Sequence, residues 1–173
     1  MNAPAFAARR ARGITLIECV IALAILAALM GVALPSFGEA MARARLRSAA
    51  QDLALGLGNA RLESVRAGAG RVHVTVAPGA NWCWSVGPVA GVDCVNPPVG
   101  STVHAVRGDD YPGITMTRGI SASFDGRDTL AAAGFAAEFV SSYGGALRVH
   151  VTPLGRASIC APERRSLDYP RCS

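Results

Sequence analysis

The pattern of apolar and polar residues changes twice along the chain, and each part predicts a different element. Residues Ile14 to Leu34 include a single charge, Glu18, and this run has about the 20 residues that a helix needs to cross a bilayer. After Pro35, apolar residues recur at alternating steps of four and three, which is the spacing of one helix face: Leu46, Ala50, Leu53, Leu57 and Ala60. From Arg71 onward the period becomes two, which is typical of strands.

Glycine, proline, asparagine and aspartate clusters divide the second half of the chain into short strand candidates. The candidates are Arg71–Val76, Trp82–Val86, Val103–Arg107, Ile114–Arg118, Ile120–Phe124, Phe135–Ser141, Leu147–Thr152 and Arg156–Cys160. Because a sheet must bury its apolar face, we expect the helix stripe to cover it, with Gly56 and Gly58 at close helix–sheet contacts and Trp82 and Trp84 in the core. The predicted fold is α+β, with a long N-terminal helix packed on a small antiparallel β-sheet or β-sandwich head.

The charges before the apolar run predict on which side of the membrane the N-terminus lies. The chain has 17 basic and 12 acidic residues, and Arg9, Arg10 and Arg12 precede the apolar run without an acid. By the positive-inside rule, this end stays cytoplasmic and the rest is exported. The run is longer than a signal-peptide core and carries a carboxylate, which argues against an ordinary signal peptide. No later stretch is comparably apolar, which argues against several spans.

Glu18 needs an explanation, because a carboxylate within a membrane helix costs about 2.5–3.5 kcal/mol and requires a partner. Gly13-Ile14-Thr15-Leu16-Ile17-Glu18 closely resembles the prepilin motif of type IV pilins and type II secretion pseudopilins. The resemblance implies cleavage after Gly13 by a prepilin peptidase, N-methylation of Ile14, and use of Glu18 in assembly through the terminal amine of a neighbouring subunit. Ile14 departs from the usual phenylalanine, whereas Pro35 stands where many type IV pilins carry a helix-bending proline.

The helix segment 33–69 and the later Gly155-Arg156 narrow the resemblance to the GspH/FimT family of minor pilins and pseudopilins. It implies a leader peptide over 1–13, a transmembrane helix over 14–35, the amphipathic half of the helix over 36–69, and a periplasmic β-rich head over 70–173. The implied partners are other pilins or pseudopilins in a helical filament, the prepilin peptidase and N-methyltransferase, an inner-membrane assembly platform and the lipid bilayer. The protein is then single-pass in the inner membrane before it enters the filament.

Four cysteines fall in the exported part, where an even number indicates disulfides. Three connectivities are possible; the shorter loops favour Cys83 with Cys94 and Cys160 with Cys172. A zinc site is the competing interpretation, although the chain has no Cys-x-x-Cys pair and its histidines, His73, His104 and His150, are dispersed. We therefore expect no metal and no cofactor. Cys19, beside Glu18, is interpreted as a small packing residue.

No hydrolase, phosphate-binding or metalloprotease motif is present in the sequence, so we expect a structural subunit rather than an enzyme. The principal hypothesis is a minor pilin at or near the tip of a type IV pilus. One alternative is a type II secretion pseudopilin. Another is a DNA-binding minor pilin for natural transformation, using C-terminal arginines: Arg156, Arg164, Arg165 and Arg171. The family's Gly-Arg-x-Arg element is incomplete, because Ser158 replaces its second arginine.

Overall fold

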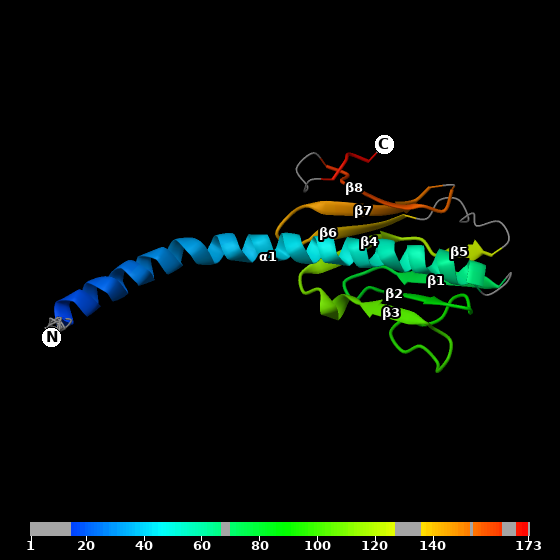
Figure 1. Ribbon diagram of the computed structural model, residues 1–173, viewed down its shortest axis with the longest axis horizontal. Helices are drawn as coiled ribbons and strands as arrows, with labels where there is room; N and C mark the ends of the chain where they lie inside the picture. Colours follow the sequence, from blue (N-terminus) through cyan, green and yellow to red (C-terminus); the bar gives the residue numbers. More distant parts are fainter. Residues whose placement is uncertain (1–14, 67–69, 127–135, 153, 164–168, 173) are drawn as a thin grey trace, which may run out of the picture. The chain divides into compact units, whose positions relative to one another are not determined.

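The computed structural model describes residues 15–66, 70–126, 136–152, 154–163 and 169–172, without the side chains of 32–36. The chain divides into two units, residues 1–38 and residues 39–173. One helix, α1 (Leu16–Arg66), contributes to both of them (Figure 1). The backbone stays helical at Pro35; its side chain lies outside the described part, and the predicted bend remains a prediction. The amphipathic half of the helix was expected to reach residue 69; α1 ends at Arg66, and residues 67–69 lie outside the described residues.

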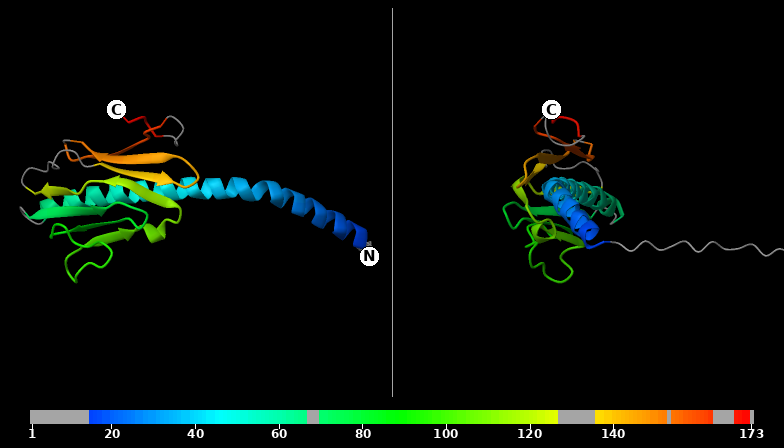
Figure 2. Two further views of the ribbon diagram at one scale, coloured as in Figure 1. Left: turned by 180° about the vertical axis from the view of Figure 1, so that it is seen from behind. Right: turned by 90° about the vertical axis from the view of Figure 1, so that its left-hand side faces the viewer.

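The second unit contains two four-stranded antiparallel sheets (Figures 1 and 2). The first sheet has the strand order β3-β2-β1-β5 and the second the order β4-β6-β7-β8. The strands are β1 (Arg71–Ala77), β2 (Cys83–Gly87), β3 (His104–Arg107), β4 (Ile114–Gly119), β5 (Ala122–Asp125), β6 (Ala136–Ser141), β7 (Ala146–Val151) and β8 (Ala157–Cys160), with a short 3-10 helix, η1 (Gly108–Asp110).

The predicted α+β class is confirmed, and every predicted strand candidate overlaps one of these strands. The bounds differ by a few residues. Ile120 was expected to begin a strand, but its N–H bonds the Ala136 carbonyl and β5 starts only at Ala122. Trp82 precedes β2, and Phe135 lies outside the described residues.

The core of the second unit forms where the predicted stripe of α1 meets both sheets. Every member of that stripe is buried, together with side chains of both sheets such as Val74 and Phe139. Trp82 and Trp84 are buried, as expected. Gly56 packs against Trp84, whereas the same expectation for Gly58 is wrong: Gly58 is exposed, and a Cβ atom there would meet nothing within 4 Å.

Two disulfides fasten the loops and the tail of the second unit. Cys83 is bonded to Cys94, and Cys160 is bonded to Cys172, which are the pairs that loop length favours. The C-terminal tail is also held by backbone hydrogen bonds, because the Ala161 N–H donates to the Pro170 carbonyl over 2.8 Å. The second disulfide and this bond keep the tail beside the end of β8.

Candidate functional site

The first turn of α1 is built around Thr15 and Glu18. The Glu18 backbone N–H donates to Thr15 Oγ1 over 3.3 Å, so Thr15 caps the helix. Thr15-x-x-Glu18 is also the sequence pattern of a capping box, in which the acid stands close to the positive end of the helix dipole. The Glu18 side chain is exposed. Its carboxylate is therefore in a favourable place on the helix and accessible to a partner, and the Thr-x-x-Glu spacing could have revealed this cap from the sequence.

Residues 16–31 of α1 are exposed on every side, although nearly all of them are apolar. Leu16, Ile17, Leu23 and Leu29 are all more than half exposed. A helix that is apolar all round needs cover from lipid or from other helices. Among the described residues, no helix meets the length and apolarity required of a membrane span. Ile14 and the side chains of 32–36, which belong to the predicted span, lie outside those residues.

A second exposed surface follows the outer side of α1 within the second unit. Its positions recur at steps of three and four, none is charged, and every one is exposed: Met41, Ala44, Ser48, Gln51, Leu55, Gly58, Leu62 and Val65. We call this set the outer stripe. At 100° per residue it lies opposite the buried stripe, and its repeat is that of a helix–helix seam. Gln51 also donates to the Tyr169 hydroxyl over 3.1 Å, so the tail borders the stripe there.

The outer stripe is not among the predicted features, because the helix periodicity was matched only to the face that covers the sheet. The signal was nevertheless present, since uncharged residues at heptad spacing can be counted directly.

The structure describes only some of the other predicted site residues. Gly13, Ile14, Arg164 and Arg165 lie outside the described residues. Arg156 and Arg171 are exposed, and the Arg156 N–H donates to Thr152 Oγ1 over 3.2 Å. The structure thus describes two of the four arginines proposed to contact DNA, and their gathering into one patch stays a prediction. Cys19 is an exposed free thiol.

The three histidines lie on three different strands, β1, β3 and β7. His104 is exposed, whereas His73 and His150 are only half-buried. His150 Nδ1 lies 3.7 Å from Cys160 Sγ, next to the second disulfide. Within the described ranges, no three histidine, cysteine, aspartate or glutamate residues form a group that could hold a metal ion.

Polar contacts join α1 to the segment between η1 and β4, where Arg45 Nη1 donates to the Pro112 carbonyl over 3.3 Å. The Tyr111 hydroxyl donates to Oδ2 of Asp52, which lies on α1. Burial, then the hydrogen bond to Asp52 and the negative charges of Asp52 and Asp110, raise the pKa of Tyr111 well above its usual value. The Tyr111 ring also stacks on Trp82, with ring centroids 5.6 Å apart. This contact fixes the start of β4 relative to the helix.

In the comparison with known protein families, the N-terminal part of the chain matches a family model. Residues 8–34 match the prokaryotic N-terminal methylation motif. No curated protein and no solved structure matches the chain. The motif is type IV pilin-like, and it indicates a structural subunit rather than an enzyme. It implies assembly with other pilins and processing by a prepilin peptidase, and it suggests a membrane-anchored protein.

Proposed function

We propose that this protein is a minor pilin of the GspH/FimT type that assembles at or near the tip of a type IV pilus. Residues 14–35 insert in the inner membrane, the leader 1–13 is removed after Gly13, and Ile14 is N-methylated. Residues 36–69 are the amphipathic half of the helix, and residues 70–173 are the periplasmic head. The apolar helix, the α+β head and the methylation motif support this proposal together.

The observation that carries the proposal is the position of Glu18. It is the only charged residue between Ile14 and Leu34 and the fifth residue after Gly13, and its side chain is exposed in the first turn of α1. A single carboxylate on an otherwise apolar packing surface specifies register, because it must meet a charged partner when it is buried. The terminal amine of a neighbouring mature subunit is such a partner.

The test compares Glu18→Ala with Glu39→Ala, an exposed glutamate on the same helix that pairs with Arg43 over 3.2 Å. Glu18→Ala should leave the amount of protein in the inner membrane unchanged and remove it from sheared filaments. Glu39→Ala should leave both amounts unchanged. Normal incorporation of the Glu18→Ala protein contradicts the proposed role.

The kind of filament requires a separate experiment. The pseudopilin alternative rests on the same motif, so deletion of the gene should be scored both for surface pili and for secretion of folded proteins. Loss of pili with normal secretion supports the type IV pilus. The reverse result supports a type II secretion pseudopilin.

A further inference from the structure

The strand β3 is an outer strand of its sheet, and half of its backbone groups point away from the sheet. Gly108 N–H donates to the Trp82 carbonyl over 2.7 Å, and Val106 stands opposite Trp84 in the register. Because hydrogen-bonding direction alternates along a strand, the N–H and C=O groups of Ala105 and Arg107 point to the open side. Among the described residues, no strand pairs with β3 there. Such an edge is a template for a further strand.

The outer strands of the second sheet, β4 and β8, differ from β3, because other segments of the chain bond to or beside them. At β4, the Gly79 N–H donates to the Met116 carbonyl over 2.8 Å and the Met116 N–H donates back over 3.3 Å. Beyond β8, Ala161 is bridged to Arg171 of the C-terminal tail, which the second disulfide fastens. The chain thus bonds to these edges itself, whereas β3 remains open among the described residues.

Three arginines on other strands show which kind of residue stands opposite an arginine in these sheets. Arg71 stands opposite Asp125, with 3.4 Å between nitrogen and oxygen. Arg148 stands opposite Glu138, at 2.7 Å. Arg118 is also in register with Glu138. Each of these arginines therefore faces an acid across the strand pair.

Arg107 differs from them. It stands opposite Cys83 on one side and faces the open edge on the other, and it is exposed. Within the described part of the chain, it has no ion pair. A strand added at this edge would fit the pattern of the other strands if it placed a carboxylate opposite Arg107.

Apolar residues are also frequent in the loop that leads into β3. The segment from Pro88 to Val103, which we call the valine loop, has one charged residue, Asp93. The Cys83–Cys94 disulfide anchors it. Its exposed valines are Val89, Val95, Val99 and Val103. Apolar residues gathered on an anchored loop are typical of an interaction surface.

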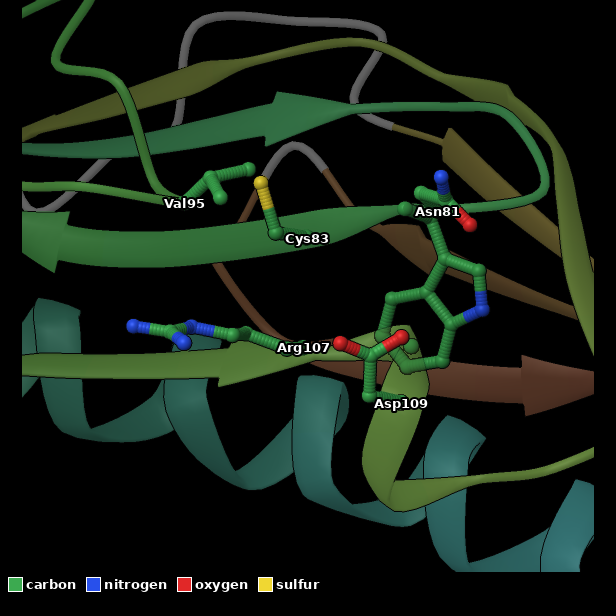
Figure 3. A pocket seen from close by; sticks show the side chains of 7 residues that line it. Asn81, Cys83, Val95, Arg107 and Asp109 are labelled. Carbon is green, nitrogen blue, oxygen red and sulfur yellow. The ribbon is translucent and has the colours of Figure 1, made fainter.

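A cavity of about 180 Å³ lies at the end of β3. Figure 3 shows Val95 beside Cys83 on one side of it, and the Arg107 and Asp109 side chains pointing in different directions. Pockets beside a pairing edge select the side chains of an added strand.

We propose that β3 binds an extended segment of a neighbouring filament subunit as an additional strand. This segment carries a carboxylate opposite Arg107 and apolar side chains against the valine loop. The inference rests on the proposed function, since it takes the neighbour to be another pilin subunit. Neighbours in a helical filament are related by a screw rotation, not by a two-fold axis. The bound segment is therefore different from β3 itself, and the short edge and its arginine restrict which strands can pair.

The test compares Ala105→Pro with Ala105→Val in the full-length protein. Proline removes the outward N–H and leaves the bonds to β2 in place, whereas valine keeps that N–H. Ala105→Pro should lower the fraction of the protein found in sheared filaments about tenfold, and Ala105→Val should not change it. Arg107→Glu should lower the fraction as Ala105→Pro does, and Arg107→Lys less. Both disulfides should form in the membrane pool of each variant, which shows that the head has folded.

Hydrogen exchange of the unaltered protein tests the proposal without any substitution. The amides of Ala105 and Arg107 should exchange quickly in the membrane pool and slowly in filaments. Equal exchange in the two pools overturns the proposal. So does a loss of incorporation with Arg107→Glu but not with Ala105→Pro, because that result indicates a charge contact without strand pairing. Normal incorporation of Glu18→Ala counts against the proposed function instead, so the two failures are distinguishable.

Discussion

Gly56 of α1 lies against the indole ring of Trp84 on β2, so closely that a Cβ atom at Gly56 would stand 2.5 Å from Cη2 of the ring. Trp84 is completely buried, and among the described residues its indole N–H has no hydrogen-bond partner. The contact therefore depends on the volume of the ring rather than on its polar atom. It sets how closely the helix approaches the sheet.

Replacing Gly56 by alanine should destabilise the head. Alanine favours the helix by about 1 kcal/mol, but an added methyl group in this position forces a shift that costs about 1–3 kcal/mol. Gly58→Ala is the matched control, because a Cβ atom there meets nothing within 4 Å, and it should stabilise the protein by up to about 1 kcal/mol. Chemical denaturation of the full-length protein in detergent measures both. Equal effects of the two substitutions would show that the contact with Trp84 is unimportant.

Gly56 and Gly58 show which features of the fold can be predicted from the sequence and which cannot. Helical spacing identified the buried stripe, and alternation located the strands, because both patterns are local. Which of the two glycines meets the sheet depends on the position of Trp84, and the division of the strands between two sheets depends on pairing between residues far apart in the chain. Periodicity predicts neither the glycine that contacts Trp84 nor the sheet to which each strand belongs.

The same limit applies to the candidate site. Glu18 was found from the sequence because a charge within an apolar run is a local signal. The Tyr111–Asp52 contact joins residues 59 positions apart, and nothing near either residue points to the other.

The two disulfides should contribute separately to stability. They span sequence separations of 11 and 12 residues, and closing loops of that length restricts the unfolded chain by about 3 kcal/mol each in the chain-entropy model. Reduction should raise the intact mass by four hydrogens, and Cys160→Ser with Cys172→Ser should release the tail while the rest of the head stays folded. The measurement is mass spectrometry followed by limited proteolysis. Stoichiometric zinc in the protein as isolated, with no change of mass on reduction, would contradict the assignment.

The Tyr111–Asp52 contact should make the head sensitive to alkali. The folded state raises the pKa of Tyr111, so it binds the proton more tightly than the unfolded state does. The resulting stability is complete below the unfolded pKa of about 10 and is lost as pH rises from there toward the raised folded pKa. The free energy of unfolding should therefore fall more steeply with pH above about 10 than it does in Tyr111→Phe. Tyr143→Phe, at an exposed tyrosine, should leave the slope unchanged; identical slopes for all three proteins contradict the prediction.

The outer stripe should matter for the filament and not for the head. Leu55 belongs to it and is 65% exposed, and Tyr143, in the turn between β6 and β7, is 65% exposed as well. Leu55→Glu and Tyr143→Glu therefore place the same charge at equally accessible positions, and each should change the stability of the head by less than about 0.5 kcal/mol. A charge on a helix–helix seam cannot be buried without a partner, so Leu55→Glu should reduce incorporation into sheared filaments while Tyr143→Glu does not. Equal incorporation of the two variants, with equal amounts in the membrane, would mean that the outer stripe faces solvent in the assembled filament.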